Sequence, residues 1–156
     1  MNGTDAGRLL DNLEYVDQET AEAYLAAVDK TVTEDMARQF DVFREEHDAH
    51  VAAYADIATR LGWPRGGPSQ SDRFRAESRR ERVERARDQD DTVEALLAIE
   101  QENLDEYRHA VAQDLPDEAR AILTRHADDE QRHVDYLLRH TPEYSAMTPA
   151  SNRFES

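Results

Sequence analysis

Residues 36–61 carry a stripe of mostly apolar side chains at spacings that alternate between four and three, and no other feature constrains the fold as strongly. The stripe consists of Met36, Phe40, Phe43, His47, His50, Tyr54, Ile57 and Leu61. Such spacing places side chains on one face of an α-helix, so the segment is expected to form a helix that buries this face. His47 and His50 therefore lie in the middle of a face that should be buried.

Three further segments repeat this helical spacing. Their stripes consist of Leu10, Leu13, Asp17, Ala21, Tyr24 and Val28; of Val93, Leu97, Glu100, Leu104, Tyr107 and Val111; and of Ala119, Leu123, His126, Glu130, His133 and Leu137. β-Branched residues are sparse, while Ala, Glu, Asp, Arg and Leu dominate, which favours helix over sheet. We therefore expect an all-α chain folded as an antiparallel four-helix bundle with one long crossover.

Capping and turn residues divide residues 1–140 into the four helices of this bundle. The helices are expected at about 8–30, 33–61, 91–113 and 116–140. Thr33 suits an N-cap, while Gly62 suits a C-cap and Pro64 cannot continue the second helix. Residues 91–94, Asp-Thr-Val-Glu, have the form of a capping box, and Pro116 suits the start of the fourth helix.

Residues 62–90 form the long crossover, and an Arg-rich stretch within it is expected to be a helix outside the core. One interpretation is that spaced ion pairs tie this helix to acidic faces of its own bundle. The other is that it docks an acidic partner or a second subunit. Residues 1–7 are expected to fray, and residues 141–156, with Pro142 and Pro149, to form a flexible C-terminal tail.

The two halves of the chain align without a gap at an offset of 83 residues. Residues 17–24 lie over residues 100–107, so that Asp and Tyr in the first half match Glu and Tyr in the second. The same offset places His50 on His133. One offset that holds across two helices indicates that the chain is one helical hairpin, duplicated.

Each stripe brings an acid or a histidine to the same level of the expected bundle. A lone buried carboxylate is unfavourable by several kcal/mol, so these groups must pair with one another or bind a cation. Their clustering favours the cation, and carboxylate oxygens with neutral imidazoles suit Fe, Mn or Zn. The candidate metal ligands are Asp17, His47, His50, Glu100, Glu130 and His133. A buried ion-pair network is the alternative.

Four further residues are expected to support these ligands. The hydroxyls of Tyr24 and Tyr107 should reach the polar layer as hydrogen-bond donors, a role that metal ligands commonly need. His126 lies one turn before Glu130 and should contact a ligand rather than act as one. Glu46 flanks the stripe beside His47 and could reach inward.

Helical phase also identifies residues that only imitate the ligand motif. Glu106-x-x-His109 has the same spelling as Glu130-x-x-His133, yet both residues point away from the stripe of their helix. They are expected to be solvated, and the same reasoning excludes Glu19 and Glu102.

These motifs resemble those of the ferritin, bacterioferritin and rubrerythrin superfamily. The resemblance rests on Glu100 with Tyr107 seven residues later, and on Glu130-x-x-His133 in the next helix. It covers most of residues 9–140, the crossover being least alike. The run 100–125 also looks like a bacterial group of ferritin-like four-helix proteins of unknown function.

The resemblance implies a site for two iron ions. Asp17 and Glu100 would be the acids that open each hairpin, Glu130 and His133 the second Glu-x-x-His pair, with His47 and His50 as its counterpart in the second helix. Two departures stand out: Asp17 replaces a longer Glu, and His47 stands where a bridging Glu is expected. Both bear on ferroxidase turnover more than on metal binding.

Two functions follow from this resemblance. The first is iron handling or redox chemistry of ferroxidase or peroxidase type, with metal ions and O₂ or peroxide as partners. The second is a non-catalytic helical scaffold or stress-response interaction protein with a degraded metal site. Hemerythrin-like oxygen binding is disfavoured because the histidines lack that family's spacing. A homodimer or a higher oligomer is compatible with either function.

Composition excludes several other classes of function. The formal net charge of −16 disfavours nucleic-acid binding, because phosphates would be repelled. The chain has no cysteine, which excludes disulfides, thiolate metal sites, iron–sulfur clusters and cysteine nucleophiles. No apolar run approaches the roughly 18 residues that span a membrane, and the polar N-terminus does not resemble a signal peptide. We expect a soluble, cytoplasmic protein.

The acidic composition predicts that salt stabilises the protein. Lys30 is the only lysine, and the excess of Asp and Glu resembles halophilic proteins, in which salt screens the repulsion between surface acids. The melting temperature is therefore expected to rise as KCl is increased from about 0.1 M to molar concentrations. Circular dichroism measures it, and a melting temperature that is insensitive to KCl would contradict the halophilic interpretation.

Overall fold

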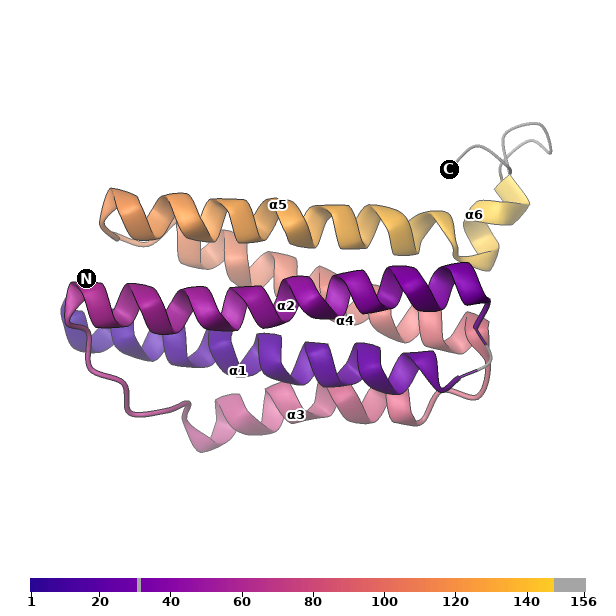
Figure 1. Cartoon of the computed structure of the whole chain (residues 1–156), viewed down its shortest axis with the longest axis horizontal. Helices are drawn as coiled ribbons and strands as arrows, with labels where there is room; N and C mark the ends of the chain where they lie inside the picture. The colour runs from indigo at the N-terminus through magenta and orange to yellow at the C-terminus, as the bar shows by residue number, and fades with distance from the viewer. Residues whose placement is uncertain (31, 148–156) are drawn as a thin grey trace.

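The computed structural model describes residues 1–30 and 32–147. These residues form six helices and no strand: α1 (Gly3–Val28), α2 (Glu34–Leu61), α3 (Gln70–Glu84), α4 (Gln89–Val111), α5 (Asp117–Arg139) and α6 (Pro142–Met147). The four long helices α1, α2, α4 and α5 lie side by side (Figure 1). The two helices of each hairpin, α1 with α2 and α4 with α5, run in opposite directions, whereas α2 and α4 run in the same direction because α3 leads the chain back along the bundle between them. The expected all-α helical bundle is confirmed. Within the described ranges, no helix is both long and apolar enough to cross a membrane.

The helix ends show where single side chains decide a boundary. Thr33 caps α2 as expected, its hydroxyl accepting a hydrogen bond from the Met36 backbone N–H at 3.2 Å. Gly62 ends the same helix in the left-handed conformation with φ of 66°, which glycine adopts without strain. Both ends of α2 therefore match the sequence expectation.

Two helix starts and the C-terminal segment differ from expectation. α1 begins at Gly3 rather than near residue 8, because the side chain of Asn2 accepts a hydrogen bond from the Asp5 N–H at 2.8 Å. α4 begins at Gln89, because Asp88 rather than Asp91 caps it, accepting from the Asp91 N–H at 2.9 Å. α6 forms within the expected tail, and residues 148–156 lie outside the described residues.

The four stripes face inward and form a core with a polar centre. Two apolar clusters fill its ends, one around Leu13, Tyr54 and Leu123, the other around Phe40, Leu96 and Leu137. On every long helix the acids and histidines of the stripe fall between the residues of these two clusters. The expected polar layer is therefore sealed by apolar side chains above and below.

The Arg-rich helix α3 lies along α1, outside the four-helix core (Figure 1). Arg79 is buried and its guanidinium donates to Glu106 at 3.2 Å, while Arg82 forms a two-pronged pair with Glu102 on α4. Arg80 lies 3.7 Å from Glu19 on α1. These contacts match the interpretation in which α3 is tied to its own bundle.

Glu19 corrects one sequence expectation. We expected a solvated side chain because Glu19 points away from the stripe of α1, yet only 7% of the residue is exposed. The reason is that α3 covers this face of α1, which the periodicity of α1 alone does not reveal.

The close approach between α1 and the loop after α2 yields a stability prediction. A Cβ added at Gly7 would overlap the backbone carbonyl oxygen of Pro64. Gly7→Ala should therefore destabilise the protein by about 1–3 kcal/mol, although alanine alone favours helix. Gly3→Ala is the control, because its Cβ would meet Trp63 at an ordinary 3.5 Å. Urea unfolding measures both, and a Gly7→Ala protein as stable as the control would contradict the packing.

Candidate metal centre

The six predicted ligands meet in the middle of the bundle and are all buried. They form two overlapping groups, Asp17, His47, His50 and Glu130 in the first, and His47, Glu100, Glu130 and His133 in the second. Within each group, one ligand atom from every residue lies within 4.8 Å of the others. His47 and Glu130 belong to both groups, so the two positions adjoin.

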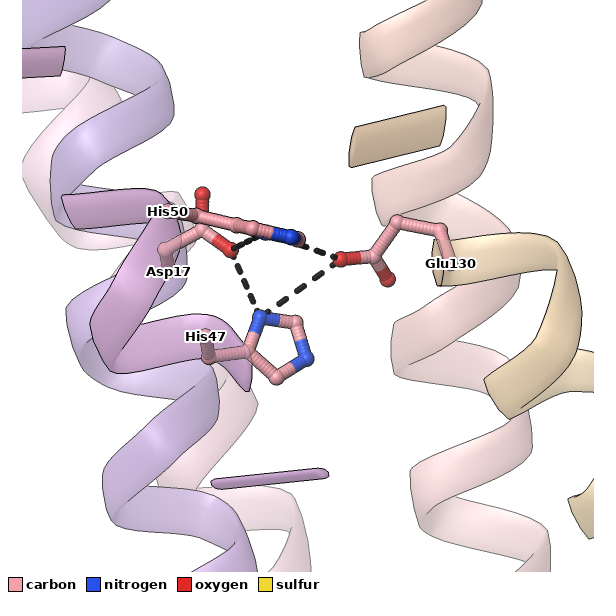
Figure 2. A group of neighbouring side chains, drawn as sticks. All are labelled: Asp17, His47, His50 and Glu130. Atoms are coloured by element: carbon pink, nitrogen blue, oxygen red, sulfur yellow. Dashed lines mark hydrogen bonds and ion pairs between the residues drawn. The ribbon is translucent and has the colours of Figure 1, made fainter. Parts of the chain in front are cut away.

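The first group surrounds one oxygen of Asp17 (Figure 2). The Nδ1 atoms of His47 and His50 lie 2.6 and 3.2 Å from Asp17 Oδ1. Glu130 points toward them from the opposite side of the bundle, with Oε1 3.5 Å from His47 Nδ1 and 3.9 Å from His50 Nδ1. Two nitrogens and two oxygens from three helices thus converge.

The second group is built in the same way around Glu100. His133 Nδ1 lies 2.5 Å from Glu100 Oε2, and His47 Nε2 lies 3.2 Å from the same oxygen. The other oxygen, Oε1, accepts a hydrogen bond from the Asn103 side chain at 3.0 Å. His47 thus presents one ring nitrogen to each group.

Tyrosine hydroxyls hold the two acids in place, as expected for Tyr24 and Tyr107. Tyr24 donates to Glu100 Oε2 at 3.0 Å, and Tyr107 donates to Asp17 Oδ2. Each tyrosine therefore contacts the acid of the other half of the chain. Burial, reinforced by the neighbouring carboxylates, raises the pKa of both hydroxyls, so both remain protonated donors.

His126 contacts a candidate ligand without joining either group. Its ring stacks on that of His50 with centroids 3.8 Å apart, and its Nδ1 lies 3.1 Å from the Tyr54 hydroxyl. Burial and the charge of His50 lower the pKa of His126 to about 3, so it stays neutral. This placement agrees with a supporting role.

Glu46 stays outside both groups. Its Oε2 lies 3.6 Å from His133 Nε2, but it also accepts a hydrogen bond from Arg132 at 2.5 Å, at the surface of the bundle. Glu106 and His109, which only imitate the ligand motif, also lie outside both groups. His109 is exposed, as expected, and contacts Gln113. Glu106 was expected to be solvated but is partly buried, because it pairs with Arg79 of α3.

Sequence reasoning missed three contacts of the centre. Tyr54 donates to Asp17 Oδ2 at 3.0 Å, and its place on the stripe of α2 was the available signal. Asn103 bonds both Glu100 and Thr20 at 3.0 Å, and the offset of 83 residues relates Asn103 to Thr20. Asp129 lies 2.8 Å from His50 Nε2, and no periodic signal marks it.

The buried charges of the centre are mutually stabilised except at one position. Burial opposes ionisation of Asp17 and Glu100, yet the adjacent histidines outweigh it and hold the pKa of both carboxyls below the usual range. Burial would lower the pKa of His47, but Glu130, Glu100 and Asp17 raise it well above its ordinary value. Burial would also lower the pKa of His50, but nearby carboxylates, chiefly Asp17, raise it.

Glu130 is the exception. Burial and the negative charge of Glu100 raise its pKa well above the usual range. Among the described residues, neither of its carboxyl oxygens has a hydrogen-bond partner, although the side chain is fully buried. His133 Nε2 is likewise buried without a partner there. Buried polar atoms are nearly always satisfied, so these orphaned atoms point to a missing ligand.

The donor set fits a metal ion. Three carboxylates and three imidazoles are the ligands that Fe, Mn and Zn share, and a cation beside Glu130 would supply the partner that its oxygens lack. The two groups are thus compatible with a buried metal site. Comparisons of the chain with protein-family models, with curated proteins and with solved structures found no match. The resemblance to ferritin-like proteins remains an interpretation of the motifs around Glu100 and Glu130.

The state of Glu130 predicts how metal-free protein responds to pH. Its folded-state pKa lies well above the ordinary value of 4.5, so above that pH the folded protein binds more protons than the unfolded chain and loses stability as the pH rises. Glu130→Gln cannot ionise and avoids this loss. With a chelator present, it should exceed the wild type in stability by on the order of 1 kcal/mol or more near neutral pH.

Urea unfolding at several pH values between about 5 and 8 measures this difference. The exposed Glu45→Gln serves as the control for the same chemical change. A stability difference between Glu130→Gln and wild type that does not grow with pH would show that Glu130 is ionised in the metal-free core.

Proposed function

We propose that the protein binds two adjacent divalent metal ions, iron in its functional form, and serves iron handling or the reduction of O₂ or peroxide. The observation that carries this proposal is Glu130. It is fully buried, its oxygens lack hydrogen-bond partners within the described chain, and it belongs to both ligand groups. A carboxylate in that position could serve as a ligand in either group, and the charge of bound cations would offset the burial and the negative charge of Glu100 that raise its pKa.

The remaining ligands divide between the two ions. Asp17 and His50 belong to the first group only, and Glu100 and His133 to the second only. His47 directs Nδ1 to the first group and Nε2 to the second, so it can serve either ion. Each ion would thus have its own acid and its own histidine, with Glu130 and His47 between them.

Iron is favoured by the resemblance to ferritin-like proteins, while the donor set suits Fe, Mn and Zn alike. Bound ferrous ions would supply the electrons for reducing O₂ or peroxide. The protein's own part is to orient the ligands and exclude water. Tyr24 and Tyr107 fix the two acids by hydrogen bonds, and the apolar clusters at both ends keep the layer dry.

A second candidate is a helical scaffold whose polar layer is structural. Asp17 favours it, because His47, His50, Tyr54 and Tyr107 satisfy both of its oxygens without any cation. In a scaffold, however, the layer would be expected to leave no carboxyl without a partner, and Glu130 is one. Metal content decides between the two candidates.

The overlap of the two groups predicts a pattern of metal stoichiometry. Wild-type protein should bind about two divalent ions per chain. His50→Ala and His133→Ala should each retain about one ion, because each removes a ligand from one group, while Glu130→Gln should retain none. The exposed His109→Ala is the matched control and should retain both ions. Elemental analysis after Fe(II) or Zn²⁺ loading and desalting measures the ions retained.

Two outcomes would contradict the proposal. Wild-type protein that retains no metal, with a melting temperature unchanged by a chelator, would favour the scaffold. Loss of metal in the His109→Ala control would show that binding occurs outside the centre. Oxygen consumption by Fe(II)-loaded protein, absent in Glu130→Gln, tests the redox step separately.

A further inference from the structure

Three charged side chains cover the metal centre where α2 and α5 meet the surface. Arg132 on α5 donates to Glu46 on α2 and to Asp129 on its own helix, both at 2.5 Å. The two acids are partly buried, with 22% and 30% of their side chains exposed, whereas Arg132 is 57% exposed. One cation on the solvent side thus holds two carboxylates that lie beneath it.

Each of these carboxylates contacts a histidine of the centre. Asp129 Oδ2 lies 2.8 Å from His50 Nε2, and Glu46 Oε2 lies 3.6 Å from His133 Nε2. The two histidines belong to different ligand groups. The surface acids therefore connect solvent to both halves of the centre through a single layer of side chains.

A second, independent feature points inward from this layer. His133 Nε2 faces Glu46, is fully buried, and has no hydrogen-bond partner among the residues that the structure describes. The same ring lies near Glu130, with His133 Nδ1 3.9 Å from Oε2, and neither oxygen of Glu130 has a hydrogen-bond partner there. Buried polar atoms without partners therefore lie between the surface acids and the middle of the bundle.

The surface beside Arg132 has room for its side chain to move. A groove of about 260 Å³ between α2 and α5 is lined by Phe43, Arg132, Tyr136 and neighbouring polar residues. The ring of Phe43, one of the lining residues, packs on that of His133 with centroids 4.1 Å apart. If Arg132 swung into this groove, Glu46 and Asp129 would face solvent with their negative charges unpaired.

We propose that Glu46 and Asp129 form an outer binding site through which divalent cations reach the centre, and that Arg132 closes it by occupying the cation's position. This inference rests on the proposed metal function. An arriving cation displaces the guanidinium, contacts the two surface acids, and passes to His133 Nε2 and Glu130. The divalent cation carries one more positive charge than the guanidinium that it displaces, so it can neutralise both carboxylates.

The test follows the rate of Co²⁺ uptake by metal-free protein, using Co²⁺ absorption in the visible range and elemental analysis at the end point. Arg132→Gln should take up Co²⁺ about tenfold faster than wild type, because a ligand-competing cation has been removed. The final number of ions should be unchanged, since Arg132 belongs to neither ligand group.

Two further variants separate the outer site from general electrostatics. Arg125→Gln removes the same charge from an exposed position two turns earlier on α5 and should leave the uptake rate near that of wild type. In the Arg132→Gln background, adding Glu46→Gln should slow uptake again, because one of the acids that attracts the cation is lost.

The outcomes distinguish this inference from the proposed function. If wild type and Arg132→Gln both bind no Co²⁺ after long incubation, the metal function itself fails. If both bind equal amounts at equal rates, or if Arg125→Gln accelerates uptake as much as Arg132→Gln does, the metal function survives and the outer site is refuted.

Discussion

The structure depends on the burial of three carboxyls and three imidazoles in one layer between two apolar clusters. Removing any of these groups from water alone would be unfavourable by several kcal/mol. Histidines offset that penalty for Asp17 and Glu100, whose pKa values are lowered despite burial. For Glu130, the charge of His47 does not outweigh burial and the negative charge of Glu100, and its pKa is raised. Neighbouring charges therefore compensate for burial at every acid of the layer except Glu130, which belongs to both ligand groups.

The surrounding fold follows from keeping this layer in place. Asp17, Glu100, Glu130 and the histidines come from four different helices, so the layer exists only when all four helices pack in register. Reciprocal bonds fix that register: Tyr24 reaches Glu100 and Tyr107 reaches Asp17, across the two hairpins. Such exchanged contacts are what a duplicated hairpin with two-fold symmetry would produce. They support the duplication that the offset of 83 residues suggests.

How much of this could be predicted from the sequence depended on the kind of signal. Helical spacing determines which side chains share a face, so the buried stripes and the six buried acids and histidines at their centre could be found without coordinates. Helix starts depend on single capping side chains, and Asn2 and Asp88 were not distinguishable from other polar residues. Asp129 and Glu19 were missed for another reason. Their burial is set by how closely a neighbouring helix approaches, and the periodicity of one helix carries no information about that.

The same helix spacing that buries Glu130 exposes its neighbours in the sequence, and this links the core to the surface. Glu130 and His133 point inward, whereas Asp129 and Arg132, each one residue earlier, lie at the seam with α2. Four residues of α5 thus supply two inner groups and two outer ones. In the proposed route, a cation held by Asp129 and by Glu46 of α2 would lie next to His50 and His133, one histidine from each group. Such a route would need no separate channel, because the surface acids already contact the buried histidines.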